Sequence, residues 1–277
     1  MKTILVPVDF SEYSEYALEV AASIAKKQKA EVVAVHMIGI PDSYLTRDEK
    51  QEIFNAIYYM EITRKRFKKF LRKDYLEDID VTEAVKSHII FSEINKVAEE
   101  YGADLVIMGS HGASGIKEAL IGSNTEKVIR TSNIPVLVIK ERIKDFKIEK
   151  AVFVTEFDKE TANAYRAAKK FFKVFGVEPE ILFINIPEKF MNSGEMHRKA
   201  YDFQIDQGKN KENYLDKVVF YNDYTAEKGV YNYCKEANID TISIPTHGRK
   251  PIGHFFFGSM GEDIANHAKI PVITFKI

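Results

Sequence analysis

Short runs of apolar, often β-branched residues alternate along the chain with longer stretches in which apolar residues recur every three or four positions. The first such run predicts a strand at Ile4–Val8, and Ser11 is placed to cap a helix that continues to about Lys26. This alternation is typical of a parallel sheet covered by helices on both faces. The pattern therefore predicts an α/β fold.

The later elements follow the same alternation. In the first half, strands are predicted at 31–37, 79–85, 105–108 and 136–139, and helices at 47–72, 91–101 and 123–131. In the second half, strands are predicted at 151–155, 181–186, 218–221, 241–244 and 272–275.

The chain repeats itself at a constant offset of 136 residues. Residues 104–140 overlie residues 240–276 without a gap and share eleven identities in 37 positions. Unrelated sequences would share about two or three. The two halves therefore have one fold, and the chain length of 277 residues fits two domains of roughly 150 residues or less. We place the domains at 1–142 and 148–277, because the polar stretch between them separates the last strand of one repeat from the first strand of the next.

Composition excludes several classes of protein. Lys and Arg total 40 against 41 Asp and Glu, so no global positive charge favours nucleic acid or anionic lipid. The only cysteine, Cys234, cannot form an internal disulfide and is expected in the core. No apolar run approaches the ~20 residues of a membrane span, so we expect a cytoplasmic protein without a membrane partner. The basic cluster 64–69 follows acidic residues on the same predicted helix and is interpreted as one face of an amphipathic helix, not as a nucleic-acid site.

Glycines mark the end of the fourth predicted strand and the start of the next helix. Gly109 and Gly112 are followed nine residues later by Gly122 and Ser123, which gives the spacing G-x2-G-x9-G-S. Glycine lets backbone N–H groups approach an anion, and a helix N-terminus adds unpaired donors with partial positive charge. Phosphate is the natural ligand, with hydroxyl donors from Ser123 and Thr125 and a cation from Lys117. The same glycines would also serve turns that bind nothing.

Two further polar residues stand at strand ends. Asp9 closes the first strand, where it can cap the following helix or hold a ribose hydroxyl or Mg²⁺. His111 lies inside the glycine loop but lacks the carboxylate or second histidine that catalysis or metal binding needs. We assign no catalytic residue and leave the metal ligands undefined.

These residues resemble the universal stress proteins, whose ATP-binding members carry G-x2-G-x9-G-(S/T) after strand four and an Asp at the end of strand one. The opening Ile-Leu-Val-Pro-Val-Asp-Phe-Ser is equally typical of them. The resemblance implies two tandem open parallel five-stranded sheets of order 3-2-1-4-5, in a Rossmann-like nucleotide-binding architecture. It also implies an ATP site, with Mg²⁺ as an optional companion, at Pro7, Asp9, Met37, Met108, Gly109, Gly112, Gly122, Ser123, Asn124 and Thr125.

The second half departs from this pattern. Pro245 replaces the first glycine and removes a backbone donor, and Glu156 is the nearest counterpart of Asp9. Three phenylalanines, 255–257, occupy the loop before Gly258. We therefore predict one competent nucleotide site, in the N-terminal half, and a degenerate second one.

In the order 3-2-1-4-5 that the resemblance implies, the last strand of each repeat is an apolar edge strand, which needs cover. Pairing the two edges would make the chain an internal pseudo-dimer, while association of whole chains is left open. The favoured function is an ATP-binding regulatory protein with slow or no hydrolysis and unidentified protein partners. The alternatives are a nucleotide-free interaction scaffold and an ATP-using enzyme.

Overall fold

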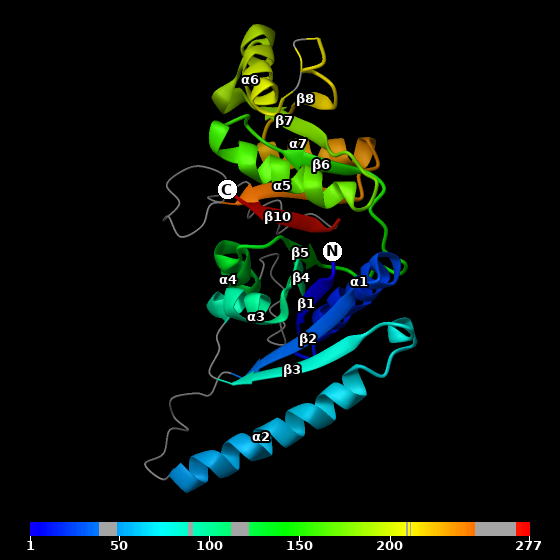
Figure 1. Cartoon of the computed structure of the whole chain (residues 1–277). Coiled ribbons are helices and arrows are strands. Elements are labelled where there is room, and N and C mark those ends of the chain that lie inside the picture. Colours follow the sequence, from blue (N-terminus) through cyan, green and yellow to red (C-terminus); the bar gives the residue numbers. More distant parts are fainter. Residues whose placement is uncertain (39–48, 88–90, 112–121, 209, 211, 247–269) are drawn as a thin grey trace. The chain divides into compact units, whose positions relative to one another are not determined.

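A computed structural model describes residues 1–38, 49–87, 91–111, 122–208, 210, 212–246 and 270–277 (Figure 1). Among these residues the chain forms two compact units. The first comprises the described residues within 1–111, 122–134 and 139–146, and the second comprises those within 135–138 and 147–277.

The first unit is built on four parallel strands in the order β3-β2-β1-β4. Their bounds are β1 (Thr3–Pro7), β2 (Glu31–Ile38), β3 (Val81–Ser87) and β4 (Leu105–Gly109). Both faces of β1 and β4 are buried, which explains why their sequences are continuous apolar runs without alternation. The two strands are neighbours, with Leu5 opposite Val106, so their carboxyl ends reach the same edge of the sheet.

Three helices pack closely on this sheet. They are α1 (Glu12–Gln28), α3 (Ile94–Tyr101) and α4 (Ser123–Thr131). The predicted cap of α1 is confirmed, because the Ser11 side chain accepts a hydrogen bond from the Ser14 N–H at 3.3 Å. Right-handed crossovers place α1 on one face and both α3 and α4 on the other. Asn95 of α3 donates to the Thr131 carbonyl of α4 at 2.6 Å.

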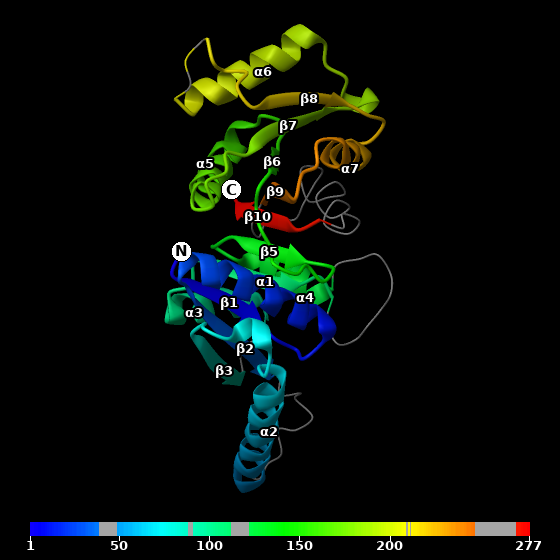
Figure 2. The ribbon, with the colours of Figure 1, turned by 90° about the vertical axis from the view of Figure 1, so that its right-hand side faces the viewer.

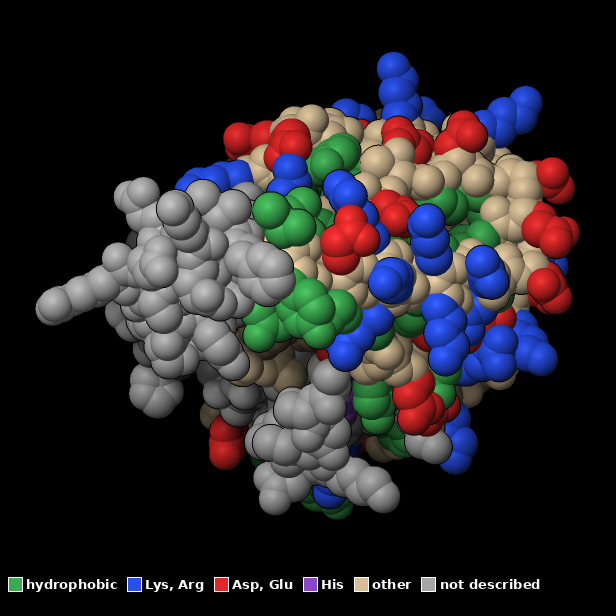
Figure 3. Space-filling model, turned by 90° about the horizontal axis from the view of Figure 1, so that it is seen from below, with side chains coloured by type: hydrophobic (Ala, Val, Ile, Leu, Met, Phe, Trp, Pro, Cys, Tyr) green, Lys and Arg blue, Asp and Glu red, His purple; other side chains and the backbone are tan. Residues whose placement is uncertain are grey.

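The long helix α2 (Glu49–Phe70) meets the sheet only near its C-terminal end (Figures 1 and 2). There Phe67 is fully buried, whereas Ile57 to Met60 in the middle of the helix are exposed. The basic residues 64–66, 68 and 69 are exposed around Phe67, as expected for an amphipathic helix. Viewed from below in Figure 3, Lys, Arg, Asp and Glu side chains are intermingled, with hydrophobic ones between them.

The second unit repeats the plan. Its strands β6 (Ala151–Val154), β7 (Glu180–Asn185), β8 (Val218–Asn222), β9 (Thr241–Thr246) and β10 (Val272–Lys276) have the order β8-β7-β6-β9-β10, which is the order 3-2-1-4-5 of the prediction. Its helices are α5 (Ala162–Lys173), α6 (Ser193–Asp206) and α7 (Ala226–Glu236). Cys234 of α7 is buried, as predicted, and burial raises the pKa of its thiol to about 12.

The last strand of the first repeat corrects one detail of the predicted architecture. Two separate sheets of five strands each were expected. In the structure, residues 136–138 of β5 (Val136–Ile139) belong instead to the second unit, where they pair antiparallel with β10. Val138 lies opposite Val272, and Val136 lies opposite Thr274. The predicted pairing of the two edges is therefore confirmed, and its reason is that both strands are buried and apolar.

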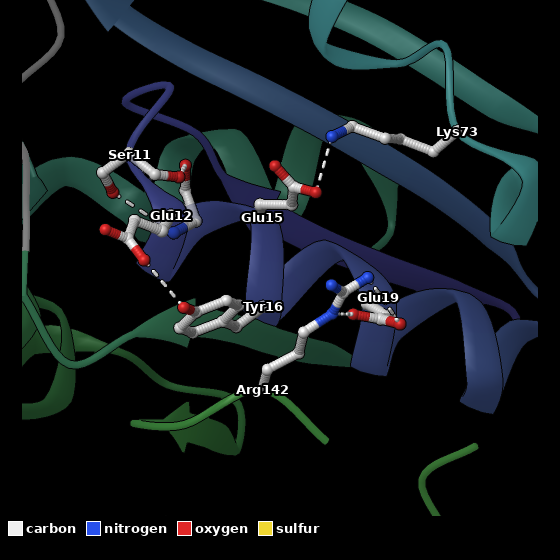
Figure 4. A network of polar contacts seen from close by, with 8 residues as sticks. Ser11, Glu12, Glu15, Tyr16, Glu19, Lys73 and Arg142 are labelled. Atoms are coloured by element: carbon white, nitrogen blue, oxygen red, sulfur yellow. Dashed lines mark hydrogen bonds and ion pairs between the residues drawn. The ribbon is translucent and has the colours of Figure 1, made fainter. Parts of the chain in front are cut away.

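Acidic residues on α1 bind a residue of the same helix and residues of two neighbouring segments of the first unit (Figure 4). Glu15 accepts from Lys73 Nζ at 2.5 Å, and Glu12 accepts from the Tyr16 hydroxyl at 2.8 Å. The Glu19 carboxylate accepts from Arg142 Nε at 2.7 Å and from its Nη2 at 3.4 Å. Glu19 is only 8% exposed at its side chain, whereas Arg142 is 49% exposed.

Replacing Arg142 with methionine is expected to lower the free energy of unfolding by about 2 kcal/mol, because Glu19 would keep a nearly buried carboxylate without its partner. Urea denaturation followed by circular dichroism measures this. The control is Arg130→Met, whose partner Glu126 is 44% exposed, and its expected cost is below about 0.5 kcal/mol. Equal losses in the two variants would contradict the role given to Glu19.

No helix in the described part of the chain is long and apolar enough to cross a membrane.

Candidate functional site

A pocket that is open to solvent lies in the first unit where β1 and β4 end and α4 begins. It is lined by residues from these three elements, from the first turn of α1 and from the short turn that starts at Phe91. The lining residues are Pro7, Val8, Asp9, Ser14, Phe91, Met108, Gly109, His111, Gly122, Ser123, Asn124 and Thr125. This is the edge at which parallel α/β sheets bind ligands.

The floor of the pocket at β1 is a tight turn through Val8, Asp9 and Phe10. The Asp9 carboxylate accepts hydrogen bonds from the Ser11 N–H at 3.0 Å and from the Ser11 hydroxyl at 2.5 Å. Phe10 is left-handed, with φ of 65°. Asp9 therefore shapes the entry to α1, although the N-cap of that helix is Ser11 and not Asp9, and it also lines the pocket.

The wall at β4 depends on the absence of a side chain at Gly109. A Cβ atom there would lie 2.6 Å from the Cβ of Tyr13 and 2.7 Å from its backbone carbonyl carbon and oxygen. The first glycine of the motif thus lets β4 approach the first turn of α1. Beyond it, the hydroxyl of the fully buried Ser110 lies 2.8 Å from His111 Nδ1, and the His111 ring lies 5.1 Å from the Tyr13 ring.

The third side of the pocket is the N-terminus of α4. Gly122 is the N-cap and has no side chain to accept from the first-turn N–H groups. These N–H groups and the helix dipole favour a bound anion. The Gly122 N–H itself donates to the Ser110 carbonyl at 2.7 Å, and the Thr125 hydroxyl donates to the Gly109 carbonyl at 2.8 Å. Both bonds hold α4 against β4, so the hydroxyl predicted to bind phosphate at Thr125 has a structural partner.

Directly behind the β1 turn lies His36 of β2. Its Nδ1 is 2.6 Å from the Val8 carbonyl oxygen, and its ring is 4.8 Å from Phe10 and 6.4 Å from Phe67 of α2. Burial lowers the pKa of His36, while the hydrogen bond to Val8 and the nearby Asp9 oppose this shift.

The structure brings together most of the residues that the sequence predicted for the site. Eight of the ten line the pocket: Pro7, Asp9, Met108, Gly109, Gly122, Ser123, Asn124 and Thr125. Met37 is buried in β2 and is not among the lining residues. Gly112 and Lys117 lie outside the described residues.

Four lining residues were not predicted: Val8, Ser14, Phe91 and His111. The position of Val8 beside Asp9 was a sufficient signal for it. His111 was assigned to a structural role on the grounds that a lone histidine cannot act by itself. Phe91 comes from a turn far away in the sequence, and no local pattern marks it as part of the site.

The second unit differs at the equivalent strand end. Glu156, like Asp9, precedes a left-handed phenylalanine, Phe157, with φ of 62°. Its carboxylate lies 3.4 Å from Lys189 Nζ, and its backbone carbonyl accepts from Lys199. Pro245 is buried in β9. The other residues predicted for this half, 247–269, lie outside the described residues.

Among the residues that the structure describes, no group of three or more His, Cys, Asp or Glu side chains is arranged to hold a metal ion.

Comparisons with known proteins agree with the repeat. The model of the universal stress protein family matches residues 1–140 and again residues 147–276. Universal stress protein MJ0577 of Methanocaldococcus jannaschii is 36% identical over 160 residues, which cover 51% of this chain and 96% of that protein. Universal stress protein YxiE of Bacillus subtilis is 30% identical over 145 residues, covering 50% and 97%.

A solved structure extends the similarity over the whole chain. The crystal structure of a universal stress protein from Archaeoglobus fulgidus covers 99% of this chain and 96% of its own, with a TM-score of 0.63 and 21% identity. At that identity the likeness concerns the fold.

Proposed function

The chain belongs to the universal stress protein family, and from this premise we propose that its first unit binds an adenine nucleotide, ATP in the first instance, in a regulatory role. The observation that carries the proposal is the pocket itself. One continuous surface joins the end of β1, the end of β4 and the N-terminus of α4. A base, a sugar and a chain of phosphates can be accommodated along these three surfaces.

Each part of the nucleotide has a chemical counterpart in the lining. The apolar side chains of Pro7, Met108 and Phe91 suit a purine and its ribose, and Asp9 can accept from a base amine or a ribose hydroxyl. The phosphates belong at the N-terminus of α4, beside the N–H groups and side chains of Ser123 and Asn124. No Lys or Arg is among the described lining residues, and Lys117, the predicted cation, lies outside the described part of the chain.

The contacts of the lining residues also favour slow or no hydrolysis of ATP. Asp9 accepts a hydrogen bond from the Ser11 hydroxyl, and His111 Nδ1 lies beside the Ser110 hydroxyl. Rapid phosphoryl transfer requires a positioned base together with cations on the transferred phosphate. We therefore propose that ATP acts as a bound signal whose occupancy selects the conformation of the surrounding loops.

The second unit is proposed to bind nucleotide poorly. Its strand-end carboxylate, Glu156, is already paired with Lys189, and Pro245 offers no N–H where the first repeat has Gly109.

One specific observation favours the alternative of a nucleotide-free scaffold. Gly109, Gly122 and Thr125 all have structural duties in the first unit, which the motif would retain even without a ligand.

Thermal denaturation with 1 mM ATP tests the proposal, together with chromatography of the supernatant from freshly purified, denatured protein. We expect released adenine nucleotide, or a rise in Tm of about 5 °C if the Kd is about 10 μM. Adenosine and inorganic triphosphate, each at 1 mM, are the controls for the two ends of the ligand. Absence of both bound nucleotide and a Tm shift would favour the scaffold, and fast phosphate release would favour an enzyme.

A further inference from the structure

The turn at the end of the first strand is built in the same way in both repeats. Phe10 and Phe157 are both left-handed, a conformation that costs a phenylalanine about 1 kcal/mol and persists only where contacts hold it. Phe10 packs against Phe67 of α2 with ring centroids 5.2 Å apart, and Phe157 packs against Phe203 of α6 at 5.6 Å. The long helix of each repeat is thus fixed to the strand-end turn by aromatic rings.

The residue beneath each left-handed ring differs between the repeats. In β2, His36 comes directly after Val35, which pairs with Pro7 of β1. In β7, Phe183 comes directly after Leu182, which pairs with Val154 of β6. Pro7 and Val154 each stand three residues before the left-handed phenylalanine, so His36 and Phe183 occupy equivalent positions. Their rings lie 4.8 Å and 5.4 Å from the phenylalanine above them. Phenylalanine therefore fills this position in the second repeat, and the turn does not require an imidazole.

What His36 adds is a hydrogen bond. Its Nδ1 lies 2.6 Å from the Val8 carbonyl oxygen, which can only accept, so Nδ1 carries the proton and donates. Val8 lines the pocket, and its own N–H donates to the Val35 carbonyl at 2.7 Å. Val8 is thereby held on both sides of its backbone in the first repeat, next to Asp9 at the pocket floor.

We propose that His36 is a positioning residue of the nucleotide pocket: it holds the Val8 carbonyl, and through it the backbone of Val8 and Asp9, in the geometry that the ligand needs. This inference rests on the proposed function of the pocket. It accounts for the presence of a polar ring in the repeat with the open pocket and of phenylalanine in the repeat whose strand-end carboxylate is paired with a lysine. The charged groups that face His36 are Asp9, which follows Val8 at the end of β1, and Arg66 on α2.

The test is to measure the Kd for ATP by calorimetry and the Tm at pH 7.5 for the wild-type chain, His36→Phe and His36→Asn. We expect His36→Phe to keep its Tm within about 3 °C, because the ring contacts remain, but to bind ATP about 10-fold more weakly. The amide nitrogen of asparagine can take the place of Nδ1, so His36→Asn should restore the affinity to within about 3-fold while its Tm falls.

The outcomes separate this inference from the proposed function. A wild-type chain that binds no ATP overturns both. A wild-type chain that binds ATP overturns only the inference if His36→Phe binds equally well, or if His36→Asn binds as weakly as His36→Phe. Failure of His36→Phe to fold also overturns it, since the position would then require histidine for structure alone.

Discussion

Replacing Gly109 with alanine is expected to lower the free energy of unfolding by about 3 kcal/mol and to abolish ATP binding. The added Cβ would lie 2.6 to 2.7 Å from three atoms of Tyr13, two of which belong to its backbone. Tyr13 sits in the first turn of α1, which is held by the Ser11 cap, so α1 must shift to relieve the clash. Because the pocket lies between this turn and β4, the same shift would deform the site.

Urea unfolding and ATP titration of Gly109→Ala measure the two effects. Gly102→Ala is the matched control, since Gly102 lies in the same unit with φ of +59° and nothing within 4 Å of its added Cβ. There only backbone strain acts, and the expected cost is about 1 kcal/mol with unchanged affinity. If both variants lost the same stability, the close approach of β4 to α1 would not be what the first motif glycine serves.

Changing Asn124 to aspartate is expected to weaken ATP binding about 30-fold, equivalent to about 2 kcal/mol, without lowering the Tm. Asn124 is exposed at the second position of α4 and lines the pocket. A negative charge in the first turn favours the helix through its dipole but repels the phosphates proposed to bind there. Opposite signs for stability and affinity are the signature of this arrangement, because a damaged fold would lower both.

Asn163→Asp provides the control for this change. Asn163 is exposed at the second position of α5 in the second unit, so the chemical change is the same but is made at a residue that does not line the pocket. ATP affinity should stay within about 2-fold of wild type. An Asn124→Asp variant that bound ATP as tightly as Asn163→Asp would show that the phosphates do not lie at α4. Adenosine has no phosphate, so its affinity should be the same for both variants and for the wild-type chain.

Much of the fold could be predicted because local patterns specify it. Apolar runs gave the strands to within two residues at either end, and the bounds of α4 and β5 agree with the prediction. The repeat then supplied the number of units, and the buried edge strands supplied the pairing of β5 with β10. What sequence pattern did not reveal is that β5 belongs to the second unit by its contacts, since the preceding residues belong to the first.

For the candidate site, the sequence predicted the location but not the role of each atom. Spacing and residue type predicted the end of β1, the end of β4 and the start of α4 as one binding edge, because parallel strands bring their carboxyl ends together, and these segments line one pocket. The tasks of individual atoms depended on distances that no spacing encodes. Thr125 gives its hydroxyl to Gly109, Gly109 makes room for Tyr13, and His36 reaches Val8 from a neighbouring strand.

The amino-acid sequence by itself determined the repeated α/β plan and the residues at the mouth of the first sheet, because periodicity, glycine spacing and helix caps act within a few residues of the chain. Only the tertiary structure decided which of those residues support the pocket and which face its interior. That choice is made by hydrogen bonds and ring contacts between residues as far apart as His36 and Val8, or Phe10 and Phe67, whose geometry exists only after the strands and helices have packed.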